Sequence, residues 1–299
     1  MNHKPSETPI LRSLLFVPGN RTKMLDKALG LSPDAFVLDM EDSVPAAEKP
    51  NARKAVASYL KKLTATGATV IPRVNAVGSE FIEEDLAAVV GPHIFGVSVG
   101  KISSPDDVNA VSDILWRLET KAKIPEGATR LVLWLETASA VVHAYQIASA
   151  SPRVAAVAFG AEDLTNDMAI ERTDDDSQFD YARNAIATAA VAAGVPALDT
   201  PFFRLGDLEG LREECLLGKR CGFRGKFAIH PEQIATINEM YSPSPAEIEQ
   251  AQRVVDAFRE AESQGHGSLS LDGRVVDVPV VRRAEKLLAL AQRASGKGK

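Results

Sequence analysis

Short apolar runs rich in β-branched residues recur along the first 230 residues, and stretches with helical spacing of apolar residues lie between them. We count eight such runs, each followed by a helical stretch. The runs are LRSLLFV (11–17), AFVLDM (35–40), TVIPRV (69–74), IFGVSV (94–99), RLVLWL (130–135), VAAVAF (154–159), VPALD (195–199) and KFAI (226–229). The helical stretches are 21–31, 46–63, 79–90, 104–119, 137–150, 178–193, 207–218 and 231–240.

We expect these strands to form a parallel sheet that is covered on both faces. Their near-continuous apolar character is typical of strands with helices on either side. Ser104 and Pro105 are start signals for one helix, and Gly194 is a stop signal for another. Eight such units close naturally into a (β/α)8 TIM barrel, which we expect over residues 1–241. An open doubly wound sheet is the alternative.

The rhythm changes in the last part of the chain, residues 242–299. Residues 242–263 predict a capped amphipathic helix, and Asp272-Gly273 predicts a hairpin turn within 268–278. A second helix over 279–294 and a disordered tail, SGKGK, complete this helix–hairpin–helix extension. Because it is too small for an independent core, we expect it to pack on the barrel or to cap a neighbouring subunit's site.

The composition is that of an ordinary globular chain and excludes several classes of protein. Lys and Arg number 34 against 40 Asp and Glu, so the net charge is −6 and no basic run suggests nucleic-acid binding. No apolar stretch is long enough for a membrane helix and the N-terminus has no targeting pattern, so we expect a cytoplasmic protein. The spacing of Cys215 and Cys221 fits neither a disulfide framework nor a zinc site, and we expect both to be reduced.

Polar residues follow the apolar runs at the points where the strands should end, which is the reactive face of an α/β barrel. Glu136 and Asp163 follow two successive strands and could reach the same point. Oxygen ligands of this kind suit Mg²⁺, which takes one or two carboxylates and leaves positions for water and substrate. The other residues at strand ends are Pro18, Gly19, Asn20, Arg21, Asp39, Glu41, Asp42, Arg73, Asn75, Lys101, Glu162, Asp199 and His230.

Each of these residues also has a purely structural interpretation. A single carboxylate after a strand can cap a helix or form a surface ion pair, but Glu136 directly follows three large apolar residues and needs a partner there. Arg73 could pair with an acid of the 39–42 cluster or bind a substrate carboxylate in a bidentate manner. His230 could be a structural histidine, and the acidic run at 174–176 a solvated loop.

One motif points to a different reaction. Gly96-Val97-Ser98-Val99-Gly100 matches the G-x-S-x-G pattern of serine hydrolases. However, Ser98 lies inside an apolar run, and the next helix does not begin at once, so a nucleophilic role is disfavoured. The glycine-rich loops that bind dinucleotides or ATP phosphates are absent from the sequence.

Seven motifs in a consistent order resemble the citrate lyase beta-subunit and malyl-CoA lyase family, within the wider HpcH/HpaI aldolase group. The motifs are RSLLFVPGNR (12–21), VLDMEDSVP (37–45), PRVN (72–75), LETASAV (135–141), FGAEDLTND (159–167), the segment from ALDTPF (197–202) to GKFAIHPEQI (225–234), and DGRVVDVPVVRRA (272–284). The resemblance implies a Mg²⁺-dependent lyase with a TIM barrel. It would split a 3-hydroxyacyl thioester, such as malyl-CoA or citramalyl-CoA, into acetyl-CoA and a 2-oxo acid.

The same resemblance implies roles for individual residues. Glu136 and Asp163 match the metal ligands of the family, and Arg73 matches the arginine that holds the oxo acid. Phe16, Arg21 and Lys27 match positions that contact coenzyme A, so together with Arg73 they are the expected substrate-binding residues. Asp277 matches an acid that relatives contribute from an adjacent subunit, which implies a homo-oligomer, a trimer or hexamer.

The proposed reaction places demands on these residues. Cleavage leaves an enolate on the acyl fragment, so the site needs a base for the hydroxyl and stabilisation of negative charge. Arg73, Glu136 and Asp277 form the expected catalytic set, with Asp277 the candidate acid or base at the acyl carbon. Three alternatives stay open: a citrate lyase beta subunit acting on citryl-acyl-carrier protein, a malyl-CoA-type thioesterase, and a non-catalytic acyl-CoA-binding protein.

Overall fold

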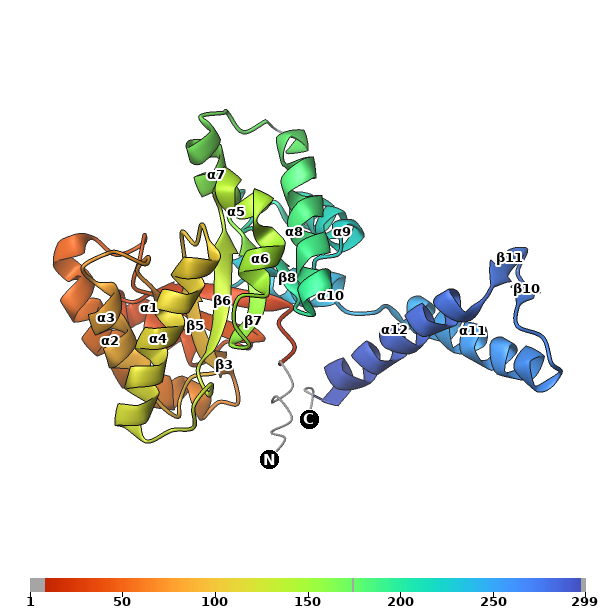
Figure 1. Cartoon of the computed structure of the whole chain (residues 1–299), viewed down its shortest axis with the longest axis horizontal. Coiled ribbons are helices and arrows are strands. Elements are labelled where there is room, and N and C mark those ends of the chain that lie inside the picture. The colour runs from red at the N-terminus through yellow and green to blue at the C-terminus, as the bar shows by residue number, and fades with distance from the viewer. Residues whose placement is uncertain (1–8, 174, 297–299) are drawn as a thin grey trace. The chain divides into compact units, whose positions relative to one another are not determined.

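A computed structural model describes residues 9–173 and 175–296 of the chain. The chain divides into two compact units, Met1–Ile237 and Asn238–Lys299. The first unit contains a sheet surrounded by helices, and the second contains two long helices and a hairpin (Figure 1). We predicted a boundary after residue 241 and a C-terminal segment that packs on the barrel or on a neighbouring subunit. That arrangement remains a prediction.

The strands of the first unit form one parallel sheet that closes on itself. Its order is β1-β9-β8-β7-β6-β5-β4-β2-β3, and β1 also pairs with β2, which completes the ring. β3 and β4 together fill one position in the barrel, because both pair with β2. They are separated at Pro72, which has no N–H group to donate to a neighbouring strand. The predicted barrel is confirmed, and the open sheet is excluded. The strands are β1 (Ser13–Pro18), β2 (Ala35–Asp39), β3 (Thr69–Val70), β4 (Arg73–Val74), β5 (Gly96–Val99), β6 (Arg130–Leu135), β7 (Val154–Phe159), β8 (Ala197–Asp199) and β9 (Gly225–Ala228).

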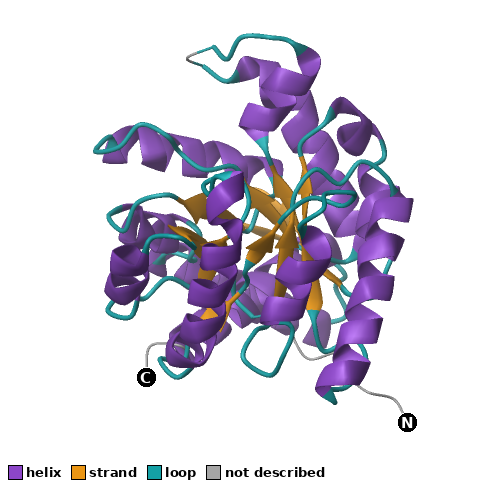
Figure 2. Cartoon of the chain, turned by 90° about the vertical axis from the view of Figure 1, so that its left-hand side faces the viewer, coloured by secondary structure: helices purple, strands orange, loops and turns teal. Residues whose placement is uncertain are grey.

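Helices surround the barrel, as Figure 2 shows. The predicted capping of the helix at 104 is present: the Ser104 hydroxyl accepts from the Asp107 N–H, and the Asp107 carboxylate accepts from the Ser104 N–H. The predicted stop at Gly194 is also present, because this residue has a left-handed φ of 76°. The helices are α1 (Thr22–Ala28), η1 (Ala46–Glu48), α2 (Lys49–Thr64), α3 (Ile82–Val89), α4 (Pro105–Ala122), α5 (Ala138–Val142), α6 (Ala144–Ala148), α7 (Ala161–Met168), η2 (Ser177–Phe179), α8 (Asp180–Ala193), α9 (Leu208–Cys221) and α10 (Gln233–Met240).

Two helical features differ from the prediction. The single helix expected over 137–150 is interrupted at His143 and forms α5 and α6. Helix α7 follows β7 directly and was not among the predicted helical stretches. Glu162 and Asp163 in its first turn are a typical helix-start signal that could have identified it.

The barrel is filled by side chains from alternate positions of its strands. Three aromatic rings form one layer: the Trp134 and Phe227 centroids lie 4.3 Å apart, and Phe16 lies 5.3 Å from Phe227. The indole N–H of Trp134 donates to the Ser98 hydroxyl across 2.8 Å. Ser98 is fully buried in this packing, so the structure gives no support to a nucleophilic role. The interior cluster contains Leu11, Leu14, Ala35, Val37, Ile71, Val132, Trp134, Ala156, Ala158, Leu198 and Phe227.

The second unit has its own small apolar cluster. It consists of α11 (Pro245–Ser263), β10 (Leu269–Leu271), β11 (Arg274–Val276) and α12 (Val278–Gly296). Asp272 and Gly273 both have positive φ, as the predicted hairpin turn requires. α12 continues to Gly296, so the first two residues of the predicted disordered tail are helical and residues 297–299 lie outside the described range. The cluster contains Ala251, Val254, Val255, Phe258, Val276, Val281 and Ala284.

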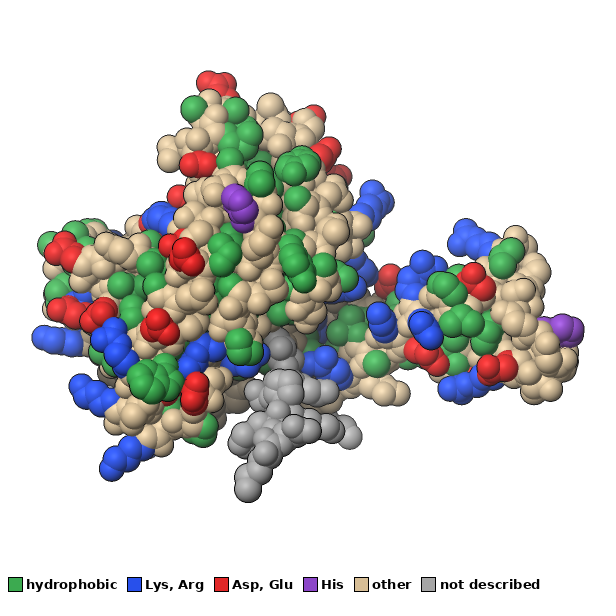
Figure 3. Space-filling model, viewed as in Figure 1, with side chains coloured by type: hydrophobic (Ala, Val, Ile, Leu, Met, Phe, Trp, Pro, Cys, Tyr) green, Lys and Arg blue, Asp and Glu red, His purple; other side chains and the backbone are tan. Residues whose placement is uncertain are grey.

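The exposed surface mixes charged and apolar side chains. On the face shown in Figure 3, Lys and Arg side chains are interspersed with Asp and Glu side chains. Several large apolar side chains on α5, α6 and α8 are also exposed, among them Val142, Tyr145 and Tyr181. No helix within the described residues is both long enough and apolar enough to cross a membrane.

Candidate active site

A pocket of about 390 Å³ lies at the carboxyl ends of the barrel strands. Its wall combines aromatic and other apolar side chains with several carboxylates and one arginine. This position is the one where α/β barrels place their catalytic residues. The lining residues are Phe16, Pro18, Asp39, Asp42, Ser43, Arg73, Trp134, Glu136, Gly160, Ala161, Glu162, Asp163, Thr200, Pro201, Phe203 and Ile229.

The alternation of side chains along each strand decides which residues face this pocket. Trp134 points into the barrel, so Glu136, two residues later, lines the pocket. By the same alternation Leu198 points inward, and Asp199 points toward the helices instead of the pocket. The expectation that Asp199 belongs with the strand-end residues of the site is therefore wrong, because side chains alternate along β8 and that of Asp199 lies on the helix-facing side.

Glu136 is a buried carboxylate with very few partners. Only 3% of the residue is exposed, and its Oε1 accepts a hydrogen bond of 2.5 Å from the Lys101 backbone N–H. Burial, and then the nearby charge of Asp163, raises its pKa to about 8. A Cβ at Gly160 would collide with the Glu136 carboxylate, and one at Gly100 would lie 3.1 Å from its Oε1. The two glycines therefore leave room for this side chain.

Asp163 reaches the same pocket from the first turn of α7. Burial, followed by the charge of Asp42, raises its pKa. Its electrostatic coupling to Glu136 shows that the structure brings the two predicted metal ligands together. The N-terminal end of a helix favours a negative charge, which partly offsets the cost of placing this carboxylate near other acids.

Arg73 is the positively charged residue of the pocket wall. Its Nε and one terminal nitrogen each donate to Asp39 across 2.7 Å, and its other terminal nitrogen lies 3.2 Å from Asp42. The guanidinium also lies over the Phe16 ring at 4.8 Å. Burial alone would raise the pKa of Asp39, but the hydrogen bonds and charge of Arg73 lower it. The ion pair that we considered for Arg73 is present, and Arg73 lines the pocket as well.

Glu41 is a further acid of the site, which we named among the strand-end residues without predicting a role for it. The residue is 4% exposed, and its Oε2 has no hydrogen-bond partner among the described residues. Burial raises its pKa to about 7, although the charge of Arg73 acts in the opposite direction. A Cβ on Gly100 would lie 2.8 Å from Glu41 Oε2 and 3.1 Å from Glu136 Oε1, so both carboxylates lie over this glycine.

Lys101 is the second strand-end residue for which no role was predicted. Its Nζ lies 3.3 Å from Glu41 Oε1 and 3.0 Å from Asp42 Oδ1, and its backbone adopts a left-handed φ of 56°. This conformation is unusual for a lysine, and the amide of the same residue donates to Glu136. Both Glu41 and Lys101 lie at the strand edge where the sequence placed them, and their ion pair is what the structure adds.

The turn that carries Glu41 and Asp42 is held by two side chains that donate to its backbone carbonyls. The Lys49 ammonium donates to the Met40 and Glu41 carbonyls at 3.0 Å each, and the Asn75 amide donates to the Met40 carbonyl at 3.0 Å. Burial lowers the pKa of Lys49, whereas the surrounding carboxylates raise it. Lys49 thus places a buried positive charge next to the backbone of the turn that carries these acids.

The donors of the pocket fit a hard divalent cation. We call the five carboxyl residues that interact electrostatically here the pocket acids: Asp39, Glu41, Asp42, Glu136 and Asp163. Three cations, Lys49, Arg73 and Lys101, face them, so negative charge is in excess. Among the described residues, no three His, Cys, Asp or Glu side chains converge to hold a metal. Two carboxylates supplemented by water and substrate oxygens are nevertheless sufficient for Mg²⁺.

The remaining predicted residues lie in different surroundings. Arg21 and Lys27 are exposed on the β1–α1 segment, and neither lines the pocket. Asp277 belongs to the second unit, where its carboxylate accepts from the Val280 N–H at the start of α12. His230 is half-buried and its Nδ1 lies 3.5 Å from the Glu232 carboxylate, and Cys215 and Cys221 are unpaired in the described structure.

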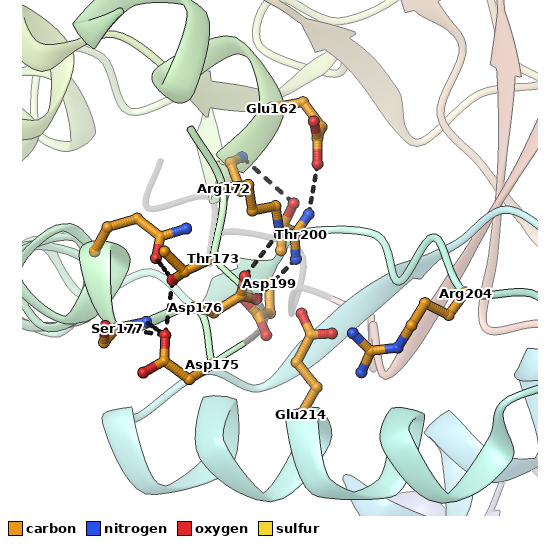
Figure 4. A network of polar contacts seen from close by, with 12 residues as sticks. Glu162, Arg172, Thr173, Asp175, Asp176, Ser177, Asp199, Thr200, Arg204 and Glu214 are labelled. Atoms are coloured by element: carbon orange, nitrogen blue, oxygen red, sulfur yellow. Dashed lines mark hydrogen bonds and ion pairs between the residues drawn. The ribbon is translucent and has the colours of Figure 1, made fainter. Parts of the chain in front are cut away.

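A chain of ion pairs connects the pocket wall with the outer side of the barrel (Figure 4). Arg172 donates to Glu162 on the pocket wall and to Asp176 by two bonds of 2.7 Å. The predicted solvated run at 174–176 needs correction, because Asp176 is buried and paired, whereas Asp175 is exposed. Asp174 lies outside the described residues. Next to this chain is a cluster that we call the outer network: Arg183, Asp199, Glu214 and Lys226.

Comparisons with known proteins give a consistent result. A family model described as HpcH/HpaI aldolase/citrate lyase matches residues 12–231. A citrate lyase subunit beta of Leuconostoc mesenteroides is 37% identical over 94% of this chain and 93% of its own length. A (3S)-malyl-CoA thioesterase of Cereibacter sphaeroides is 37% identical over 94% of both chains.

A solved structure is similar over nearly the whole chain. It is the crystal structure of CitE from Mycobacterium tuberculosis in complex with magnesium, acetoacetate and coenzyme A. The two chains are 29% identical, the match covers 96% of this chain and 99% of the other, and the TM-score is 0.77. The Mg²⁺ that we predicted from the residues is the metal in this related structure.

Proposed function

Since the chain belongs to the HpcH/HpaI aldolase/citrate lyase family, we propose that it is a Mg²⁺-dependent carbon–carbon lyase. It would cleave a 3-hydroxyacyl-CoA, such as malyl-CoA or citramalyl-CoA, into acetyl-CoA and glyoxylate or pyruvate. The observation that carries this proposal is the pair of coupled carboxylates, Glu136 and Asp163, beside Arg73 in a single pocket. The related CitE structure with magnesium and coenzyme A supports it.

Glu136 and Asp163 are the residues that would hold the cation. Glu136 fits this task because it is buried, has room between two glycines and forms no ion pair with a cation of the described residues. When bound, Mg²⁺ supplies Lewis-acid polarisation of the hydroxyl or oxo oxygen of the substrate. Glu41 adds negative charge next to this position.

Arg73 is proposed to bind the carboxylate of the oxo acid and to stabilise charge on its oxygens. The two hydrogen bonds to Asp39 and the contact with Phe16 fix the plane of the guanidinium. A fixed donor requires little reorganisation during the reaction, which makes its electrostatic contribution effective.

The thioester and its protons are assigned to other residues. Phe16, Arg21 and Lys27 are proposed to contact coenzyme A, and the two exposed cations suit its phosphates. Asp277 is proposed to exchange a proton with the acyl carbon. This role requires a trimer or hexamer in which the second unit of one subunit completes the pocket of another.

A mixing experiment tests the shared site. Arg73→Ala and Asp277→Ala should each be nearly inactive, because each removes a group from the proposed catalytic set. A mixture of the two variants, after subunit exchange confirmed by mass spectrometry, should regain part of the activity. Complete absence of recovery would contradict a site that is shared between subunits.

Two other functions have specific support. The similarity to citrate lyase beta subunits favours a citryl thioester carried on acyl-carrier protein, and the similarity to a malyl-CoA thioesterase favours hydrolysis of the thioester. A non-catalytic binding protein has less support, because binding alone does not require the buried carboxylate pair.

One assay separates these functions. The purified protein is incubated with racemic malyl-CoA, citramalyl-CoA or citryl-CoA, with Mg²⁺ or with EDTA, and products are identified by mass spectrometry. Metal-dependent release of acetyl-CoA and one oxo acid is the result we expect. Free coenzyme A with an intact hydroxy acid would identify a thioesterase, and absence of turnover would favour a carrier-bound substrate or a binding protein.

A further inference from the structure

We propose that Lys101 is an internal counter-ion of the pocket acids that competes with the divalent cation and moves away when that cation binds. The proposal rests on the metal site described under the proposed function. It goes beyond that site because it assigns a control of metal affinity to a residue that is not itself a ligand.

The first observation is the way in which Lys101 is attached. Its backbone N–H is bonded to Glu136, while its ammonium reaches Glu41 and Asp42. The side chain of Lys101 is 42% exposed, whereas that of Glu41 is only 5% exposed. The ammonium therefore neutralises a buried acid from a position that is open to solvent.

The second observation is that Lys101 is the cation of the site that can move. Arg73 is held by two hydrogen bonds to Asp39, and Lys49 is buried with its ammonium on two backbone carbonyls. Among the described residues, the ammonium of Lys101 contacts two carboxylate side chains, at 3.0 and 3.3 Å, from a long stem with several rotatable bonds. Displacing it would break no hydrogen bond to the backbone.

The third observation is the state of Glu41. Its Oε1 lies 3.3 Å from the Lys101 ammonium, its buried Oε2 lies 3.3 Å from a terminal nitrogen of Arg73, and both Glu41 and Glu136 lie over Gly100. A buried carboxylate in this condition requires a nearby positive charge. Arg73 and Lys101 supply that charge together, and Arg73 is fixed by Asp39. A divalent cation held by Glu136 and Asp163 would replace the contribution of Lys101 and repel its ammonium.

The sign of the mutational effect distinguishes this role from a merely structural one. Lys101→Met removes the ammonium but keeps the backbone N–H to Glu136. If Lys101 competes with the cation, this variant should bind Mg²⁺ about tenfold or more tightly. If Lys101 instead arranges the acids for the metal, the same variant should bind Mg²⁺ more weakly.

The experiment uses the full-length protein after treatment with EDTA. Isothermal titration calorimetry measures Mg²⁺ affinity, and electron paramagnetic resonance measures Mn²⁺ affinity, for the wild type, Lys101→Met and Lys101→Gln. Lys123→Met is the matched control, because Lys123 has the same left-handed φ of 56° but is exposed and belongs to no ion pair of the described residues. Lys123→Met should retain wild-type affinity.

A second measurement follows the lysine directly in the wild-type protein, so it does not depend on the folding of a variant. Acetylation of Lys101 by a water-soluble ester, quantified by mass spectrometry, should accelerate at least about threefold when Mg²⁺ is added. Acetylation of Lys123 should not change.

The outcomes separate the two proposals. Unchanged or weaker Mg²⁺ binding by folded Lys101→Met, or an unchanged acetylation rate of Lys101 while Mg²⁺ binds, would overturn the counter-ion role and leave the metal site intact. Failure of the wild type to bind either Mg²⁺ or Mn²⁺ would overturn the metal site and this proposal with it.

Discussion

Two buried charged clusters of the barrel differ in how completely their charges are matched. In the outer network, the Lys226 ammonium lies 3.1 Å from Asp199 and 2.9 Å from Glu214, and Arg183 also contacts both acids. Two cations thus face two carboxylates within this cluster, and Arg183 also lies 3.6 Å from Asp176, which has Arg172 as its own cation. The pocket acids exceed the cations around them, and Glu41 and Glu136 have raised pKa values as a result of their burial.

This difference in pairing separates carboxylates that stabilise the fold from carboxylates that serve the reaction. A buried carboxylate that is fully paired joins neighbouring elements, here β8, β9, α8 and α9. A buried carboxylate without a sufficient partner costs stability and persists where a ligand supplies the missing charge. The comparison predicts loss of stability from substitutions in the outer network, and loss of activity from substitutions of the pocket acids.

The largest effect is expected at Glu136. Glu136→Gln should lower Mg²⁺-dependent turnover by about a thousandfold or more, since it removes a charged ligand at the place where negative charge develops. Circular dichroism should show an unchanged fold. Glu162→Gln, a neighbouring substitution on the same pocket wall, is the control and should retain most of the activity. Turnover of Glu136→Gln near that of the wild type would remove the metal assignment.

Lys226→Met tests whether the outer network stabilises the fold. The substitution leaves two buried carboxylates with one cation fewer, so the free energy of unfolding should fall by about 3–5 kcal/mol. Urea denaturation monitored by circular dichroism measures this loss, and Lys54→Met on the exposed face of α2 is the control. The folded fraction should keep the wild-type affinity for Mg²⁺. A change of affinity without a loss of stability would reverse the roles of the two clusters.

Gly160 tests the space around Glu136. In Gly160→Ala the new methyl group would meet the Glu136 carboxylate, so turnover should fall about 10- to 100-fold through displacement of that side chain. Gly91→Ala is the matched control, because a Cβ there meets nothing within 4 Å. Steady-state kinetics of both variants decide the point. Equal activities would mean that the position of Glu136 is not critical.

The smallest effect concerns a matched pair far from the pocket acids in sequence. Glu119 accepts from the Arg153 guanidinium at 2.7 and 2.8 Å and from two backbone N–H groups. Burial would raise the pKa of Glu119, but these hydrogen bonds, that of Arg153 first, lower it below 4.5. Its folded state therefore binds protons less readily than the unfolded state.

The pH dependence follows from that sign. The stabilisation is present above the unfolded pKa of about 4.5 and is lost as the pH falls through the lower folded value. Glu119→Gln should lower the free energy of unfolding by about 1–3 kcal/mol at pH 7, and by less below pH 4. Urea unfolding of both proteins at the two pH values measures the difference. A difference that grows on acidification would contradict the assignment.

Much of the barrel could be predicted from the sequence, because each strand is a buried run with local boundaries. The position of Glu136 was also predictable, since it directly follows a strand. The side to which each strand-end residue points depends on the pleat, and Asp199 was misplaced for this reason. The left-handed backbone of Lys101 and the pairing of Glu41 with both Arg73 and Lys101 arise from tertiary packing and left no local pattern.

The fluorescence of Trp134 can report on the pocket, because its side chain lines the pocket wall. Its indole is 4% exposed, stacks with two phenylalanine rings and lines the pocket, whereas Trp116, the other tryptophan of the chain, is 52% exposed on α4. The two fluorophores should therefore emit at different wavelengths and differ in their access to a soluble quencher. A protein with Trp116 replaced by Phe would carry a single intrinsic fluorescent reporter of pocket occupancy, without any attached dye.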